Sequence, residues 1–380
     1  MDKILKNEVV FINSKKIKKG HQTCPLIDPA SSFANCLPCD NNSIKMTSCQ
    51  SPIEKELADK FEPKKLASEP LVLSYYRLGM DKRAETVASC GTFLEFAEYV
   101  GASGGLPLGA SRSSEYKLHK ANFCKDRLCP MCSWRRSYKI FGQVSKIMNV
   151  IADKYCFLFL TLTVINCKGT ELSETLDKMS KAFNRMFHLK RIKNAVRGFF
   201  RALEITYNED NNTFHPHFHC VLAVPKSYFK GSMYIQRDEW LEMWQKSMND
   251  PRITQVDIRK AKDKHNRDNK TASEALASAV AEVAKYTVKS SDYLKKDESL
   301  TDSLVRTFSD VLYHRRLVAL SGCFKEAHKQ LQLDDVENGD LLHLNDNIRP
   351  DVAVQIYRYG WSCGCYKLID VSVPAVEYDE

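Results

Sequence analysis

The stretch that decides the fold is residues 198–224, GFFRALEITYNEDNNTFHPHFHCVLAV. Its two apolar segments, 198–207 and 214–224, have the aromatic and β-branched composition of strands, and a polar turn lies between them. The stretch therefore predicts a β-hairpin. Because side chains alternate along a strand, His217 and His219 should share one face while Phe218 points to the other face, into the core.

The same hairpin predicts a metal site. Two histidines on one face of a strand can chelate one divalent ion, and Glu204 on the facing arm would complete a set of three ligands with positions left for water or phosphate. His-x-His pairs also occur on protein surfaces without binding a metal, so the pair alone does not decide whether these histidines are ligands. His215, next to a proline, is expected to mark the entry to the strand rather than to bind metal.

Outward from the hairpin, the pattern continues as a mixture of strands and helices. Further strands are expected at 155–165 and 253–258, and helices at 133–152, 173–194, 240–248 and 272–293. We therefore expect an α+β fold with a central antiparallel sheet flanked by helices. A small module held by a metal should precede it.

The segment 272–293 carries a second group of polar residues. Glu282, Tyr286 and Lys289 are four and three residues apart, which places them on one face of the expected helix. Tyrosine is a weak nucleophile at neutral pH unless a metal or cation favours the phenolate. A tyrosine beside a lysine, facing a metal, could attack a phosphodiester, and a carboxylate one turn away could act as general base. An ordinary amphipathic helix would show the same spacing.

Cysteines form the third signal. His119, Cys124, Cys129 and Cys132 have spacings that fit a closed, tetrahedral structural zinc site, and Cys90 is a rival for the fourth position. A redox Cys-x-x-Cys pair is the alternative, but no thioredoxin-like context surrounds it.

Basic residues surround these cysteines. Lys125, Arg127, Arg135 and Arg136 are suited to phosphate contacts. Across the chain, 56 Lys and Arg against 47 Asp and Glu give a net charge of +9, which suits a polyanionic partner, although many basic proteins bind no nucleic acid.

Composition narrows the class of protein. With 43% hydrophobic and 27% charged residues, the chain is expected to be globular, and the longest apolar run, 155–167, is too short to span a bilayer. No apolar segment follows the first residues as in a signal peptide, so we expect a cytoplasmic protein without membrane contact. The absence of a P-loop pattern predicts no nucleotide cofactor.

We expect four parts along the chain. These are an irregular leader (1–70), a basic module stabilised by zinc (71–150), a catalytic domain (151–298) and a mainly helical C-terminal region (299–380).

Taken in order, the motifs resemble the replication initiator (Rep) proteins of bacterial rolling-circle plasmids, within the HUH endonuclease superfamily. The resemblance covers about residues 75–345. Cys90-Gly91 and the stretch from Arg315 to Gly322 also resemble segments of this family. The matching segments are CKDRLCPMCSWRR (124–136), FLTLT (159–163), ALEITY (202–207), HPHFH (215–219) and EVAKYTVK (282–289).

The resemblance implies a role for each matching residue. Tyr286 matches the nucleophile that nicks one strand at the double-strand origin, stays joined to the 5′-phosphate and leaves a 3′-hydroxyl primer. His217 and His219 match the metal-binding pair. Glu282 matches the acidic residue that this single-tyrosine branch has where other branches have a second tyrosine, and it would let the last cleavage proceed by hydrolysis.

The resemblance also implies partners. Lys285 and Lys289 would lie near phosphate or the catalytic Mg²⁺ or Mn²⁺, and the DNA would be the single-stranded or hairpin origin. A host helicase and DNA polymerase would supply unwinding and synthesis. Two alternatives remain: a relaxase or transposase of the same superfamily, and a zinc-stabilised DNA-binding regulator without catalysis. The intact set of Tyr286, Glu282 and the two histidines favours the enzyme.

Overall fold

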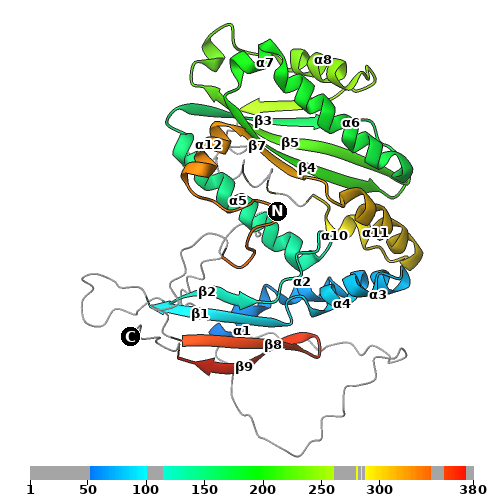
Figure 1. Ribbon diagram of the computed structural model, residues 1–380, viewed down its shortest axis with the longest axis vertical. Helices are drawn as coiled ribbons and strands as arrows, with labels where there is room; N and C mark the ends of the chain where they lie inside the picture. The colour runs from blue at the N-terminus through cyan, green and yellow to red at the C-terminus, as the bar shows by residue number, and fades with distance from the viewer. Residues whose placement is uncertain are drawn as a thin grey trace, which may run out of the picture.

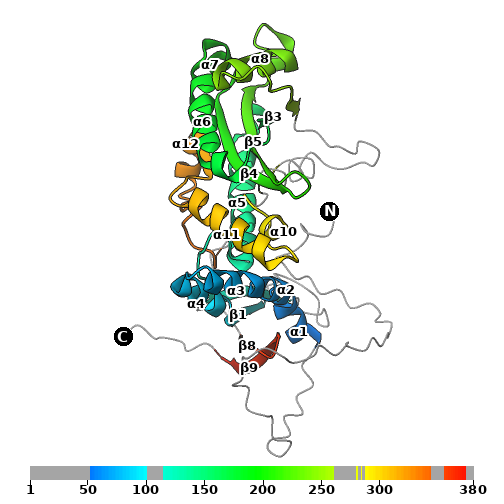
Figure 2. The ribbon, with the colours of Figure 1, turned by 90° about the vertical axis from the view of Figure 1, so that its right-hand side faces the viewer.

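The computed structural model describes residues 52–100, 114–260, 280, 284, 287–343 and 355–373. Within them the chain forms two antiparallel sheets, flanked by helices, at opposite ends of an elongated molecule (Figures 1 and 2). The expected α+β class, with a central antiparallel sheet flanked by helices, is confirmed.

The larger sheet contains the hairpin that the sequence predicts. Its strand order is β6-β3-β5-β4-β7, so the histidine-bearing strand β5 is central. The strands are β3 (Tyr155–Thr163), β4 (Gly198–Asn208), β5 (Thr213–Pro225), β6 (Val256–Lys260) and β7 (Val318–Gly322). Phe218 is buried and its ring packs edge-on against Phe183, with ring centres 5.5 Å apart. The alternation predicted for this strand is therefore confirmed for Phe218.

Helices cover both faces of this sheet. The Phe218 face packs against α6 (Gly169–His188), α7 (Lys190–Ala195) and α8 (Arg237–Met248). The opposite face packs against the second half of α5 (Pro130–Ile151) and against α12 (Cys323–Gln330). In the described ranges, no helix, α5 included, is both long and apolar enough to cross a membrane.

The smaller sheet joins distant parts of the sequence. Its order is β2-β1-β8-β9, and β1 pairs directly with β8 from near the C-terminus. The strands are β1 (Phe93–Val100), β2 (Ser114–Ala121), β8 (Gln355–Ser362) and β9 (Cys365–Ser372). The neighbouring helices are α1 (Pro52–Asp59), α2 (Glu62–Leu66), α3 (Glu69–Arg77), α4 (Asp81–Ser89) and α11 (Glu298–Leu312). Phe96 lies in this core between Phe61 and Tyr359, with edge-on ring contacts to both.

The structure departs from the expected divisions of the chain. Helices α1 and α2 lie inside the expected irregular leader, and α3 begins there, whereas 1–51 lie outside the described residues. The described part of 299–380 is a mixture of helices and strands, because it supplies β7 to the larger sheet and β8–β9 to the smaller one. Both additions pair strands far apart in sequence, which local patterns do not reveal.

The expected helix 272–293 is also interrupted. Val280 is helical, but Lys289 has extended backbone (φ −78°, ψ 146°) and precedes the short α10 (Ser290–Tyr293). Lys289 therefore does not continue the face of an unbroken helix, as the spacing had suggested.

Candidate metal centres and active site

Glu204, His217 and His219 meet on one face of the larger sheet. Glu204 is the cross-strand partner of His217, and His219 lies one step further along β5. Glu204 Oε2 is 3.0 Å from His217 Nε2 and 2.7 Å from His219 Nε2. The three ligand atoms lie within 4.8 Å of one another, so the group could hold a metal ion.

Neighbouring groups orient both imidazole rings. His217 Nδ1 is 3.2 Å from the carbonyl oxygen of His215, and His219 Nδ1 is 3.3 Å from Thr161 Oγ1. When the Nδ1–H groups donate these bonds, each Nε2 presents a lone pair toward Glu204. His215 thus contributes its backbone, which agrees with the expectation that its side chain is not a ligand.

The charge of Glu204 is fixed by its surroundings. Burial opposes ionisation of this carboxyl, but hydrogen bonds from the two histidines and the nearby charge of Lys289 outweigh it, and its pKa lies far below the usual range. Lys289 Nζ is 3.1 Å from Oε1, the oxygen that faces away from the histidines. The glutamate side chain is 6% exposed and that of Lys289 38%, so the lysine lies between the buried carboxylate and solvent.

The segment that precedes Lys289 runs beside this group. The Ile205 amide, next to Glu204, donates to the Thr287 carbonyl at 2.7 Å. Val280 and Ala284 are buried on the histidine face of the sheet, in a cluster that includes Phe159, Phe200 and Ala202. The candidate residues Glu282, Lys285 and Tyr286 lie outside the described residues.

Four cysteines form the second candidate centre. Cys90 Sγ is 3.5 Å from Cys132 Sγ and 3.7 Å from Cys129 Sγ, and Cys124 Sγ is 3.6 Å from Cys132 Sγ. All four sulfurs lie within 4.8 Å of one another and none is in a disulfide, so they too could hold a metal ion. Hydrogen bonds from its neighbours hold the pKa of Cys129 well below the usual thiol value.

Backbone geometry brings Cys90 to the other three cysteines. The Gly91 amide donates to the Asn122 carbonyl (2.9 Å), which ties the start of the β1–β2 hairpin to its end. Gly91 has φ +66°, and a Cβ there would approach Met131 to 3.1 Å. A side chain at this position would therefore suffer both strain and crowding.

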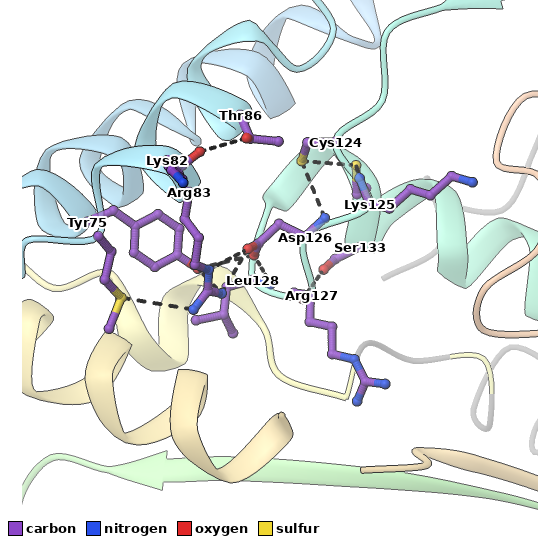
Figure 3. Close-up of polar contacts among 12 residues, drawn as sticks. Tyr75, Lys82, Arg83, Thr86, Cys124, Lys125, Asp126, Arg127, Leu128 and Ser133 are labelled. Atoms are coloured by element: carbon purple, nitrogen blue, oxygen red, sulfur yellow. Dashed lines mark hydrogen bonds and ion pairs between the residues drawn. The ribbon is translucent and has the colours of Figure 1, made fainter. Parts of the chain in front are cut away.

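The loop from Cys124 to Cys129 is held by Asp126 (Figure 3). Its carboxylate accepts two bonds from Arg83, at 2.8 and 3.0 Å, and one from the Leu128 amide at 2.8 Å. The Lys125 amide donates to Cys132 Sγ (3.2 Å) and the Asp126 amide to Cys124 Sγ (3.4 Å), so the backbone of the loop holds two of the four sulfurs.

His119 is not part of this cluster. Its Nε2 lies 3.6 Å from Glu95 on the adjacent strand, and burial lowers the pKa of the imidazole. The buried side chains of Tyr116 and Leu118 alternate with His119 along β2, so the strand directs His119 to the opposite face. The fourth position belongs to the rival, Cys90. Cys90 precedes the β1–β2 hairpin and Cys124 follows it, each by a few residues, so the pairing of the two strands brings them together.

The basic residues of the cysteine module divide into two kinds. Arg135, expected to contact phosphate, is 3% exposed and donates to the carbonyls of Leu341 and Leu342, so that expectation is corrected. A long side chain on a helix face toward the protein interior serves packing instead. Arg127 and Arg136 are half-buried and also donate to backbone carbonyls. Lys125 is exposed.

Two supporting residues escaped the sequence analysis. Thr161 bonds His219, and it is one of two threonines, with Thr163, on the histidine face of a mainly apolar strand. Threonines at alternate positions of such a strand are a signal that the sequence offers. Lys65 is buried and donates to the Cys90 carbonyl at 2.8 Å. Nothing in its local sequence distinguishes it from a surface lysine.

Comparisons with known proteins identify a family and several relatives. Residues 115–364 match the model of a family described as "Replication protein". A "Protein rep" of a Bacillus species is 40% identical over 273 residues, covering 69% of this chain and 85% of its own length. One from Streptococcus pneumoniae (serotype 2, strain D39 / NCTC 7466) is 36% identical over 290 residues, covering 75% and 83%.

Relatives occur in a third genus. A "Protein rep" of Staphylococcus aureus is 35% identical over 225 residues, covering 58% of this chain and 88% of its own length. No solved structure matched the chain. The family match covers all five strands of the larger sheet, with Glu204, His217 and His219, and it reaches β2 and β8 of the smaller sheet. The chain therefore belongs to the replication-protein family of plasmid Rep initiators.

Proposed function

We propose that this Rep protein nicks one DNA strand at the double-strand origin of its plasmid. In the reaction the Tyr286 oxygen attacks the scissile phosphorus and loses its proton. The bond to the 3′-oxygen breaks, and that oxygen leaves as a hydroxyl that primes synthesis. The 5′-phosphate remains on the tyrosine. Because one phosphodiester replaces another, rejoining needs no nucleotide.

The observation that carries the proposal is the convergence of Glu204, His217 and His219 on one sheet face. A bound Mg²⁺ or Mn²⁺ would polarise the phosphate and stabilise the charge of the transition state. The two histidines present Nε2, and Glu204 presents Oε2. Lys289 forms an ion pair with the other oxygen of Glu204, and its side chain is partly exposed, so it can also contact phosphate.

The position of Thr287, the residue after Tyr286, supports the role of Tyr286 as nucleophile. Thr287, which follows it directly, is bonded to Ile205 next to the metal ligand Glu204. In this proposal Glu282 is the general base that activates water in the terminating cleavage, so the protein acts once. Lys285 contacts the DNA backbone.

For the cysteine cluster we propose a structural zinc ion. In a tetrahedral site with Zn–S bonds of about 2.3 Å, the sulfurs are about 3.8 Å apart. The pairs Cys90–Cys132, Cys124–Cys132 and Cys90–Cys129 are 3.5–3.7 Å apart, and all four sulfurs lie within 4.8 Å of one another. Four protein ligands leave no open position, so this ion holds the fold and takes no part in cleavage.

The proposed partner is origin DNA in single-stranded or hairpin form. Lys125, which is exposed beside the zinc cluster, is the basic residue of that module best placed for phosphate contacts. Host helicase and polymerase supply unwinding and synthesis, since the sequence holds no P-loop pattern.

The test is incubation with single-stranded origin DNA and Mn²⁺, followed by a denaturing gel. We expect a protein–DNA band that survives SDS, with the modified peptide mapping to Tyr286. Tyr286→Phe should abolish the band, whereas Tyr313→Phe, at an exposed tyrosine (74%), should retain it. His217→Ala should also abolish it, with zinc content unchanged.

The His217→Ala variant is the sharper test of metal dependence, because a chelator can also strip zinc. DNA binding without any adduct, in protein with zinc bound, would refute the nickase and favour a non-catalytic regulator.

A further inference from the structure

A cavity on the helix-covered face of the larger sheet, opposite the Glu204 site, has no role in the proposed chemistry. It lies between α6, β4 and β7 and has a volume of about 290 Å³. Its lining residues are Asp177, Ser180, Phe183, Asn184, Phe199, Arg201, Arg315, Arg316 and Ala319. Three arginines against one aspartate make its wall strongly basic.

Arg201 is the unusual member of this wall. It is only 7% exposed, and its guanidinium stacks on Phe218 and Phe183, 4.3 and 4.9 Å from the ring centres. Its Nε has no hydrogen-bond partner, and among the described residues no carboxylate pairs with it. Burial lowers the pKa of this guanidinium. A buried arginine is normally paired, because removing its charge from water is costly.

The other two arginines differ in how firmly they are held. Arg315 Nη1 lies 2.5 Å from Asp177 Oδ1, which neutralises the one acidic group of the wall. Arg316 is mostly exposed (74%), and its nearest carboxylate, Asp335, is 3.7 Å away. Arg201 is thus a fixed, unsatisfied donor, while Arg316 can turn toward a ligand in the cavity.

We propose that this cavity binds a phosphate group, with Arg201 as its principal donor and Arg316 closing over it. A planar guanidinium presents donors in a fork that matches phosphate oxygens, and the two phenyl rings hold that fork in place. The phosphate belongs either to a small anion or to the backbone of a DNA strand. This would be a second phosphate site, separate from cleavage.

The test compares the full chain with Arg201→Met, which keeps the apolar stem and removes the donors. In buffer without phosphate or added divalent ions, we expect Arg201→Met to melt close to the parent. The substitution loses the stacking on Phe218 and Phe183, but it also removes the cost of a buried charge without a carboxylate partner. Inorganic phosphate or dTMP should raise the melting temperature of the parent by a few degrees and leave Arg201→Met unchanged. Lys181→Met, which removes an exposed charge of α6 outside the cavity, should respond like the parent.

A second measurement distinguishes a backbone phosphate from a small anion. If the ligand is DNA, Arg201→Met should weaken binding of a short oligothymidylate by about 10- to 100-fold and lower its salt slope by roughly 0.7, as for one lost phosphate contact. Arg316→Ala, at an exposed residue, should give a smaller loss in the same assay.

Equal responses of the parent, Arg201→Met and Arg316→Ala to phosphate, dTMP and oligothymidylate would overturn the proposal. Neither assay requires cleavage, so this outcome is independent of whether the protein is a nickase.

Discussion

At the scale of single residues, the Glu204 centre depends on groups that do not themselves bind metal. Each histidine has an Nδ1 partner, and Lys289 bonds the outer oxygen of Glu204. Such partners fix the tautomer and the direction of a ligand. The strand positions of the ligands were predictable from alternation, but the partners depend on which strand lies beside β5, which alternation does not specify.

Thr161→Val should therefore weaken Mn²⁺ binding, because it removes the partner of His219 Nδ1 and preserves side-chain shape. Loss of such a supporting residue costs about 10- to 100-fold in metal affinity, and calorimetric titration with Mn²⁺ would measure it. Thr163→Val is the matched control, since Thr163 Oγ1 donates to the Gln255 carbonyl and to neither histidine. Equal affinities of the two variants would contradict the role assigned to Thr161.

At the scale of elements, the sequence predicts the helices and strands whose alternation of apolar and polar residues is visible within the element itself. The hairpin β4–β5, strand β3 and helices α5, α6 and α8 all form close to the expected residues. The errors concern elements whose partners are remote. Strands β8 and β9 lie in a region expected to be mainly helical. They form a hairpin with each other, and β8 joins the sheet through β1, more than two hundred residues earlier. The prediction of His119 as a ligand was wrong for a related reason. Strand pairing, which the sequence does not reveal, places its side chain next to Glu95 and away from the cysteines.

The place of β8 in the cysteine module can be measured with one substitution. Tyr359 is 1% exposed and its ring contacts Phe96 of β1. Tyr359→Ala should lower the free energy of unfolding by about 3–5 kcal/mol, as is usual for an aromatic side chain truncated in a core, in urea titrations followed by circular dichroism. Tyr313→Ala, at a residue 74% exposed, should change it by less than about 0.5 kcal/mol. Similar values for both would mean that β8 does not dock on β1.

At the scale of the whole molecule, α5 connects the two sheets. It has 22 residues, so it is about 33 Å long. Cys129 and Cys132 lie at its start, whereas Ile140, Val144 and Ile147 pack beneath the larger sheet (Figure 1). Arg135, in the first half, is bonded to the segment at Leu341. The candidate metal centre of the cysteine module and the histidine face of the larger sheet are thus joined through one helix. The histidine face packs on its own apolar cluster, separate from the cluster that contains Cys129 and Cys132.

Removal of zinc should consequently loosen one end of the molecule and leave the other intact. Hydrogen–deuterium exchange, compared between zinc-loaded and zinc-stripped protein, should show faster exchange in β1, β2 and the 122–133 segment. The second half of α5 and strands β3–β5 should keep their protection, because apolar contacts such as Val144 and Phe200 hold them without metal. Cys90→Ser should reproduce the zinc-free pattern, while His119→Ala should match the loaded protein. Excess Mg²⁺ in all samples excludes an effect of an ion at the Glu204 site. Simultaneous loss of protection in β5 would show instead that zinc supports the entire fold, and that the two ends unfold as one unit.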